Sequence, residues 1–577
     1  MTHPATTPGH RRILASVLLG ALVGACGTTT ITPGTSPGPD ASTVPPSAST
    51  AGAVPCDTAV ASPGTPEAPA SWWRDRVFYE VFVRSFADSD GDGIGDLRGL
   101  IHRLDYLNDG DPATTTDLGV TALWLMPIAE SPSYHGYDVT DYMAVEPDYG
   151  TADDVRALMA AAHERGIDVV VDLVLNHSSS EHPWFQDART PGSDHDDWYV
   201  WSDTDAGIAG PGGTEVWHRD GERWYYGYFW EGMPDLNVEE PDVSAALDDV
   251  AAFWLGDLGV DGFRLDASKH LVEDGATLEN TPATKTWLQD FRSRVQTVDP
   301  DALLVGEVWD ATSISAEYVR DEALDMTFDF ELASAILSAV RLGDAGSLTQ
   351  VLADVQLRYP RDGFATFLAN HDQDRVLDVL GRDRAAAALA ATILLTSPGV
   401  PFLYYGEEVG MRGRKPDEEI RTPLAWDATE PGHGFTDGTP WEPFAPGVED
   451  ADIAGQTDVP ASLLSHYRSL IALRAAHPAL RDGALVPMDD APRGVYAVLR
   501  QGVDETLLVL ANLGDEAVDG ASLTLASGPL CGRPTAEVLF GAADVAAPSV
   551  TAGGGFDGYV PVTHLEPRQA VVVRLSP

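Results

Sequence analysis

The feature that most constrains the fold of this chain is a repeated alternation of short apolar, β-rich runs with helix-forming stretches. The runs lie at residues 77–86, 122–128, 168–177, 262–267, 303–309, 326–332, 365–372 and 401–408. Segments with helical periodicity, such as 153–165 and 243–258, separate most of them. Strands that alternate with helices form parallel βα units. Eight such units predict an α/β fold of the (β/α)8 TIM-barrel type, whose sites lie at the carboxyl ends of the strands.

Two segments of the 577-residue chain interrupt or follow this repeat. Residues 178–232, after the third run, are rich in Trp, Tyr, Gly, Asp and His, and loops of this length are usually functional or form small subdomains. Residues 483–577 alternate apolar strands with turn residues, which predicts a C-terminal all-β sandwich. We therefore expect a barrel at 71–177 and 233–482, an inserted subdomain at 178–232 and the sandwich at 483–577.

The N-terminus has the pattern of an export signal. Two arginines precede an apolar run at 13–23, which is too short to span a bilayer but suits the core of a signal peptide. The segment 22–26 resembles a bacterial lipobox, in which small residues precede a cysteine. This predicts a signal peptide at 1–25 and a lipidated Cys26 that tethers an exported protein to the membrane. The alternative is ordinary cleavage and secretion.

Residues 26–70 read as a linker between Cys26 and the folded body. Gly, Pro, Ser, Thr and Ala dominate this stretch, which therefore buries too little apolar area to offset the entropy of ordering it. A tail without a role is the alternative to a tether. If Cys26 is lipidated, Cys56 and Cys531 remain, and an exported chain permits one disulfide between them.

The charge of the chain limits its partners. There are 89 acidic and 36 basic residues, which gives a formal net charge of -53. Such a surface repels phosphate backbones and anionic lipid, so we expect no nucleic acid partner and membrane contact only through the lipid anchor. A soluble surface explains the charge, and adaptation to salt is an open alternative. We expect a monomer.

Polar residues gather where several of the predicted strands end. The clusters lie at 172–177, 262–270, 306–309 and 370–372. Alternate side chains of a strand share a face, so Arg264 and Asp266 point the same way. Asp266, Glu307 and Asp372 end the fourth, fifth and seventh strands, which brings three carboxyl groups to one mouth of the barrel. Unrelated surface acids are the alternative, but they do not account for clusters at four strand ends.

Retaining glycoside hydrolysis is a reaction that can use three neighbouring acids. It needs one ionised carboxylate as nucleophile and one protonated carboxyl group that acts first as acid and then as base. Arg264, two residues from Asp266, would favour the ionised form of Asp266. Glu307 is followed by Val308 and Trp309, and such apolar surroundings would keep its proton near neutral pH.

These segments resemble the α-amylase family of glycoside hydrolases, family thirteen, over residues 72–577. The resemblance implies that Asp266 is the nucleophile, Glu307 the acid/base and Asp372 the third carboxylate, which stabilises the transition state. It also implies a set of residues that hold the reacting sugar, with the tyrosine stacking on its ring: Tyr137, His177, Arg264 and His371.

The signals for the type of enzyme are mixed. The segment 233–237 resembles a form intermediate between the oligo-1,6-glucosidases and the neopullulanases, and 421–427 resembles the oligo-1,6-glucosidases. Lys269 and His270 resemble α-amylases, in which they contact the sugar on the leaving side. We expect an α-amylase acting on starch, maltodextrins and maltooligosaccharides. The alternatives are an exo-acting α-glucosidase or oligo-1,6-glucosidase, a transglycosylase, or a non-catalytic lipoprotein that captures maltodextrin. A non-catalytic lipoprotein of this kind would be expected to lack the three acids.

The segment after the first run follows the logic of a calcium loop. Oxygen donors recur at every second position and a glycine at position six permits a tight turn, but position twelve is Gly99 rather than a bidentate glutamate, so this is not an EF-hand. An acidic turn without a metal is the alternative. The segment also resembles the calcium loop of part of the α-amylase family, which implies a structural Ca²⁺ held by Asp88, Asp90, Asp92, Ile94 and Asp96. A second site at Asn176 and the His270 carbonyl stays open.

Overall fold

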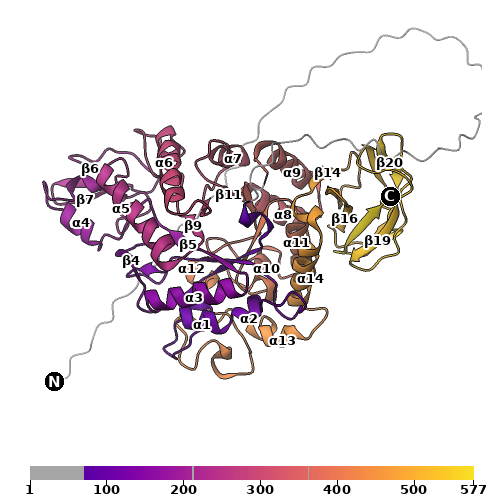
Figure 1. The fold of residues 1–577 in the computed structure, drawn as a ribbon, viewed down its shortest axis with the longest axis horizontal. Coiled ribbons are helices and arrows are strands. Elements are labelled where there is room, and N and C mark those ends of the chain that lie inside the picture. Colours follow the sequence, from indigo (N-terminus) through magenta and orange to yellow (C-terminus); the bar gives the residue numbers. More distant parts are fainter. Residues whose placement is uncertain (1–70, 211–212, 362) are drawn as a thin grey trace, which may run out of the picture.

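The structure is a computed structural model in which residues 71–210, 213–361 and 363–577 are described (Figure 1). The predicted signal peptide at 1–25, the lipidation site Cys26 and the linker to residue 70 lie outside the described residues. None of the helices in the described part of the chain is long and apolar enough to cross a bilayer.

A closed parallel barrel forms the centre of the molecule. Its strands are β1 (Phe78–Val81), β2 (Ala122–Leu125), β5 (Asp168–Leu173), β9 (Gly262–Leu265), β10 (Leu303–Gly306), β11 (Met326–Phe328), β12 (Phe364–Thr366) and β13 (Val400–Tyr404). They follow chain order around the barrel, and β13 closes it against β1. Each predicted run contributes one strand, so the TIM-barrel prediction is confirmed.

The sixth run is shorter as a strand than the sequence predicts. β11 ends at Phe328, and helix α8 (Phe330–Leu342) begins two residues later. The Asp329 side chain accepts a hydrogen bond from the Leu332 amide, which caps the helix N-terminus. An apolar run that continues into a buried helix does not reveal where the strand ends.

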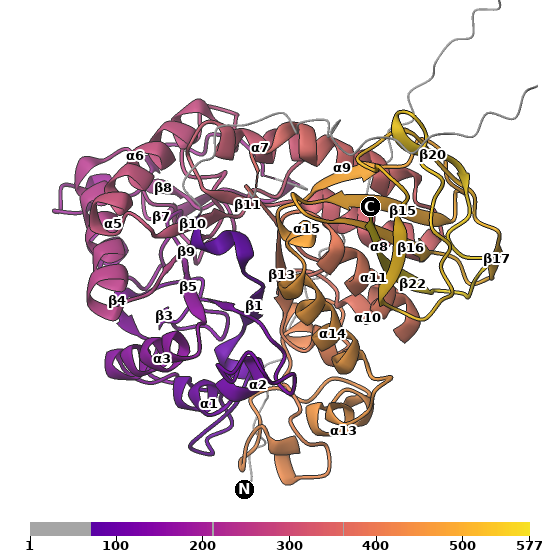
Figure 2. The same ribbon diagram turned by 45° about the vertical axis from the view of Figure 1, so that its right-hand side comes forward.

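Helices surround the barrel (Figure 2). The longer ones are α3 (Ala152–Glu164), α5 (Pro241–Ala252), α6 (Pro282–Val298), α7 (Thr312–Arg320), α8, α9 (Gly346–Arg358), α11 (Arg384–Thr396) and α14 (Leu463–Ala476). α3 begins with a reciprocal capping box between Thr151 and Asp154. The predicted helix at 243–258 is α5 continued by a π-helical segment, Phe253–Leu258, which ends at Gly259 with φ of 78°.

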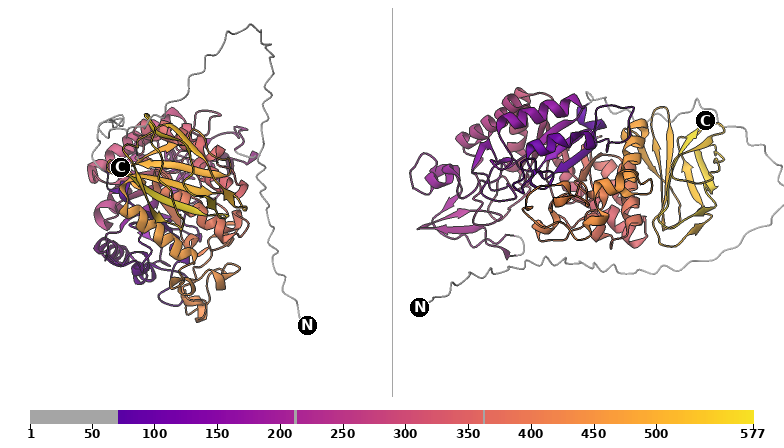
Figure 3. Two further views of the ribbon diagram at one scale, coloured as in Figure 1. Left: turned by 90° about the vertical axis from the view of Figure 1, so that its right-hand side faces the viewer. Right: turned by 90° about the horizontal axis from the view of Figure 1, so that it is seen from below.

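The segment between β5 and α5 carries its own small sheet. Helix α4 (Pro183–Ala188) is followed by β6 (Trp201–Ser202), β7 (Trp217–Asp220) and β8 (Arg223–Tyr226), which form an antiparallel sheet in the order β6-β8-β7. Part of its aromatic content packs inward, because Tyr226 and Tyr228 are buried with Val216 in one cluster. Figure 3 shows this insert and the C-terminal sheets at opposite ends of the barrel.

The C-terminal part is all β, as predicted. A five-stranded sheet has the order β14 (Ala484–Pro487), β15 (Val495–Gln501), β16 (Thr506–Asn512), β22 (Ala570–Ser576) and β19 (Thr535–Phe540). Its strands alternate between two cores: Tyr496 and Val498 belong to the cluster that includes the barrel helices, whereas Val495 and Ala497 face the pair β18 (Leu523–Ser527) and β20 (Gly554–Tyr559). The sheet therefore packs on both faces.

Cys531 of the C-terminal part is disulfide-bonded. Its partner lies outside the described residues, so the pairing with Cys56 stays a prediction. The chain has three cysteines.

If Cys26 carries lipid, peptide mapping of the mature exported protein under non-reducing conditions should recover one linked pair, Cys56 with Cys531. A link from Cys26 to Cys531, or two free thiols, would contradict the predicted pairing.

Candidate active site

The barrel interior changes from apolar to polar toward the carboxyl ends of its strands. Phe78 and Val170 lie in an apolar cluster inside the barrel. Two residues later on the same strand faces come Glu80 on β1 and Asp172 on β5, both buried. Arg264 on β9 is the register neighbour of Asp172 and is fully buried. Strand alternation thus places a charged layer directly beneath the barrel mouth.

Arg264 is the centre of this layer. Its Nη1 lies 2.9 Å from Asp172 Oδ1 and 2.7 Å from Asp266 Oδ1, and its Nη2 lies 2.6 Å from Glu307 Oε2. The guanidinium carbon is 5.2 Å from the centre of the Trp124 ring. One cation therefore binds three carboxyl groups from β5, β9 and β10 and holds Asp266 and Glu307 side by side. Two carboxylates on one guanidinium are compatible with the about 5 Å separation of retaining glycosidases.

Burial dominates the electrostatics of Asp266 and Glu307. Desolvation raises the pKa of Asp266 to about 6, although Arg264 works in the opposite direction. Desolvation also raises the pKa of Glu307, again against the pull of Arg264. The guanidinium contacts both acids, so the expectation that Arg264 would act on Asp266 and leave Glu307 in apolar surroundings is too simple.

Asp372 differs from the other two acids because cations surround it. His371 Nε2 lies 3.2 Å from Asp372 Oδ2, and Arg421 Nη2 lies 2.9 Å from Asp372 Oδ1. Lys415 Nζ is 3.8 Å from the same Oδ1. Burial alone would raise the pKa of Asp372, but His371, Arg421 and Lys415 bring it well below its usual range. Asp372 is thus ionised throughout the neutral range.

His371 connects Asp372 to the barrel wall. Its Nδ1 lies 2.6 Å from Glu80 Oε1, and its Nε2 lies 2.7 Å from the Tyr137 hydroxyl. The Tyr137 hydroxyl is 3.0 Å from Asp172 Oδ2, and the Tyr137 and His371 rings stack at 5.5 Å between centroids. Two buried polar groups, His371 and Asp172, therefore fix the Tyr137 hydroxyl.

His177 is buried and held between Tyr137 and Asn176. Its Nε2 is 3.2 Å from the Tyr137 carbonyl oxygen, and its Nδ1 is 3.0 Å from Asn176 Oδ1. Burial lowers the pKa of His177 to about 3, so the ring is neutral near neutral pH. A neutral ring in this position can exchange hydrogen bonds with a sugar hydroxyl group without carrying charge.

Lys269 and His270 follow Asp266 and form one side of the site. Lys269 Nζ donates to the Trp309 carbonyl oxygen at 2.9 Å and pairs with Glu279 at 2.7 Å. The His270 ring lies 4.0 Å from the Tyr228 ring, centroid to centroid. Burial lowers the pKa of His270 to about 4. This side of the site thus combines one cation with neutral aromatic surfaces.

A pocket of about 470 Å³ opens at this end of the barrel. Seven of the predicted site residues line it: Tyr137, His177, Asp266, Lys269, His270, Glu307 and Asp372. The two others, Arg264 and His371, are fully buried behind them and contact them directly. All of the predicted catalytic and sugar-binding residues therefore belong to one continuous arrangement.

Three further residues of this arrangement had no predicted role: Glu80, and Asp172 and Arg421 of the segments 172–177 and 421–427. Glu80 and Asp172 were each visible as a charged residue inside an apolar run, two positions after an inward-facing residue. That period-two pattern was sufficient to place them in the barrel. Arg421 lies 49 residues after Asp372, and its contact with that carboxylate gives no local signal in the sequence.

The predicted calcium loop brings part of its ligand set together. Carboxylate oxygens of Asp88, Asp90 and Asp96 lie within 4.8 Å of one another. This donor set suits a hard cation. Asp92 is not one of the three, and its Oδ1 accepts the Ile94 amide at 2.8 Å. Asp88 also accepts the amides of neighbouring glycines, which shapes the loop.

The polar groups considered for a second metal site satisfy one another. Asn176 Nδ2 donates to the His270 carbonyl oxygen at 2.9 Å and to Asp235 Oδ2 at 3.1 Å. Asp235 belongs to the segment that ends the insert and was not identified from the sequence. Burial and then Glu273 raise its pKa well above the usual range. As found, these groups connect the insert to the barrel.

Comparisons with known proteins identify the family of the chain. A family model described as the alpha amylase catalytic domain matches residues 80–483. Over 459 residues the chain is 39% identical to Alpha-amylase 3 of Dictyoglomus thermophilum, covering 77% of this chain and 85% of that protein. It is 35% identical over 518 residues to the trehalose synthase/amylase TreS of Mycobacterium tuberculosis, covering 79% and 84%.

A solved structure supports the same assignment. The crystal structure of the alpha-amylase from H. orenii superposes with a TM-score of 0.74 at 41% identity, covering 87% of this chain and 99% of that one. The family model spans well over half of the 577 residues. The chain belongs to the alpha-amylase family of glycoside hydrolases.

Proposed function

We propose that this protein is an α-amylase, a retaining enzyme that cleaves α-1,4-glucosidic bonds of starch, maltodextrins and maltooligosaccharides. The observation that carries the proposal is the Arg264 guanidinium, which holds Asp266 and Glu307 side by side in the pocket that Asp372 also lines. Two adjacent carboxyl groups of this kind suit double displacement rather than inversion, which needs room for a water molecule between them.

In the proposed mechanism the three acids have separate tasks. Asp266 attacks the anomeric carbon while Glu307 gives its proton to the departing glycosidic oxygen. Water then attacks the glycosyl-enzyme, and Glu307 takes a proton from it. Asp372, ionised and flanked by His371, stabilises the positive charge that develops on the sugar ring. Tyr137 offers its ring to the same sugar.

An exo-acting α-glucosidase is the second candidate, because charged residues border the pocket beside Asp372. Arg421 and Asp417 line the pocket and pair with each other at 3.2 Å. If this pair closes the pocket, only chain ends can enter it. Products distinguish the two candidates: an endo-acting enzyme lowers the viscosity of soluble starch before much glucose appears, whereas an exo-acting enzyme releases glucose from the start.

We also propose a structural Ca²⁺ at the loop of Asp88, Asp90 and Asp96, with Asp92 and the Ile94 carbonyl as the remaining predicted donors. The three grouped carboxylates support this site. The sequence pattern at 11–26 supports export, with Cys26 as a lipid anchor or with secretion if the lipobox is not used.

Replacing Glu307 tests the proposed acid/base directly. Glu307→Gln keeps the shape of the side chain but removes the transferable proton, so kcat on soluble starch should fall by about two orders of magnitude or more. Maltoheptaose binding, measured by calorimetry, should change little. Glu317→Gln on α7 is a matched control because that glutamate is half exposed and pairs with Lys285 outside the pocket. Near-normal turnover of Glu307→Gln would contradict the assignment.

The raised pKa of Asp266 predicts an acid limb in the pH profile. The nucleophile must be ionised, so kcat/KM should fall as the pH drops through about 6. Steady-state rates on a maltoheptaoside from pH 4 to pH 9 measure this limb. A plateau that continues down to about pH 4, the range of an unburied carboxyl group, would show that a different acid limits the reaction.

Removal of Ca²⁺ should mainly affect stability. The loop holds three carboxylates within 4.8 Å, and hydrogen bonds such as those from the Gly91 and Gly93 amides to Asp88 offset only part of their mutual repulsion when no cation is bound. EDTA should lower the melting temperature, and added Ca²⁺ should restore it. Asp90→Asn, at an exposed ligand, should reduce the response to EDTA. An unchanged melting temperature in EDTA would remove the support for the site.

A further inference from the structure

Glu80 is a buried acid that none of the proposed catalytic steps uses. It lies on β1, faces the barrel interior and is 2% exposed. Its Oε1 accepts from His371 Nδ1 at 2.6 Å and from the His371 backbone amide at 3.4 Å. These contacts join the first strand of the barrel to the segment that carries Asp372, 291 residues later in the chain.

The hydrogen bonds beyond His371 depend on its protonation. A ring protonated on both nitrogens donates from Nδ1 to Glu80 and from Nε2 to the Tyr137 hydroxyl oxygen, leaving the Tyr137 proton free for Asp172 Oδ2 at 3.0 Å. A neutral ring that still donates to Glu80 has only a lone pair at Nε2. It would then accept a hydrogen bond from the Tyr137 hydroxyl group, which could no longer donate to Asp172.

Several charged groups lie around His371. Glu80 approaches from β1, Asp372 from the same segment, and Asp172 lies beyond Tyr137. Arg421 Nε donates to the His371 carbonyl oxygen at 3.0 Å, and the edge of the ring packs against Trp124 on β2. Burial lowers the pKa of His371, but Asp372 and Glu80 outweigh it and raise this pKa to about 9.

We infer that Glu80 is a positioning residue that keeps His371 protonated on both ring nitrogens, and thereby fixes Tyr137 and Asp372 in the geometry that the reaction needs. The inference rests on the proposed roles of Tyr137 and Asp372. Glu80 does not line the pocket, so it acts through His371 rather than on the sugar.

The test compares Glu80→Gln with the unaltered enzyme as a function of pH. Glutamine keeps an oxygen that can accept from Nδ1 but removes the charge, so the pKa of His371 should fall by about two units. The alkaline limb of kcat/KM should move down with it. At pH 8 the variant should lose about tenfold or more in kcat/KM, whereas at pH 6, with His371 still protonated, it should stay within about threefold of the parent.

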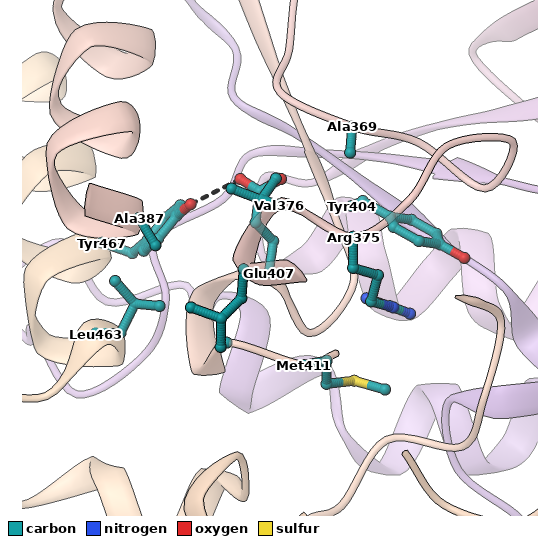
Figure 4. Close-up of a pocket in the computed structure, with 11 residues that line it drawn as sticks. Ala369, Arg375, Val376, Ala387, Tyr404, Glu407, Met411, Leu463 and Tyr467 are labelled. Carbon is teal, nitrogen blue, oxygen red and sulfur yellow. Dashed lines mark hydrogen bonds between the residues drawn. The ribbon is translucent and has the colours of Figure 1, made fainter. Parts of the chain in front are cut away.

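Glu407→Gln is the matched control. Glu407 follows β13, is 6% exposed and accepts from the Tyr467 hydroxyl at 2.7 Å, as Figure 4 shows, whereas the ring nitrogens of His371 hydrogen bond to Glu80 and Tyr137. Burial raises the pKa of Glu407 to about 8, so this side chain already holds a proton at neutral pH, which glutamine mimics. Its pH profile should match that of the parent. Glu80→Asp, which retains the charge, should restore part of the alkaline activity.

A direct measurement makes the inference independent of activity and of the folding of the Glu80 variants. Nitrogen-15 NMR of the imidazole groups in the parent protein, with His371→Asn used to assign the signal, should show His371 as imidazolium at pH 7.5. A neutral His371 at that pH would overturn the inference, and so would identical pH profiles for Glu80→Gln and Glu407→Gln. If the protein failed to hydrolyse glucans, the proposed function would be wrong. The NMR result would still decide whether His371 is protonated on both ring nitrogens.

Discussion

The site depends on a single buried cation. The Arg264 guanidinium lies inside the barrel, where an isolated charge would be costly, and three carboxyl groups from successive strands compensate it. The parallel register of β5 and β9 sets Asp172 beside it, and β10 supplies Glu307. The register of the barrel strands therefore also sets the arrangement of these polar groups, because a shift of one strand would separate the guanidinium from one of its carboxyl partners.

Burial and charge divide the acids into different roles. Desolvation dominates at Asp266 and Glu307 and raises both pKa values, whereas the cations around Asp372 lower its pKa. Acids whose pKa values are shifted in opposite directions can serve as a proton donor and as a permanent anion in the same pocket. The groups that create this division, His371 and Arg421, come from segments after β12 and β13, so the distinction is a product of tertiary structure.

The sequence predicted the barrel well because its signals are local. Each strand is an apolar run bounded by polar residues, and two of the proposed catalytic acids, Asp266 and Glu307, directly follow such a run. Strand ends were less predictable, since β11 gives way to the helix capped by Asp329 without a change in apolar character. Contacts such as Glu80 with His371 join segments that are 291 residues apart, and a pattern read along one segment contains no information about the other.

The two-sided packing of the C-terminal sheet has a mechanical consequence. One face of that sheet belongs to the same core as the barrel helices, with α14 against β19 and α15 (Pro478–Arg481) against β15. A shared core of this kind resists hinge bending, because rotation of the sheet would open an apolar seam to water. Conformational adjustments at the pocket are therefore expected in the loops at the barrel mouth and in the insert rather than between the barrel and the C-terminal sheet.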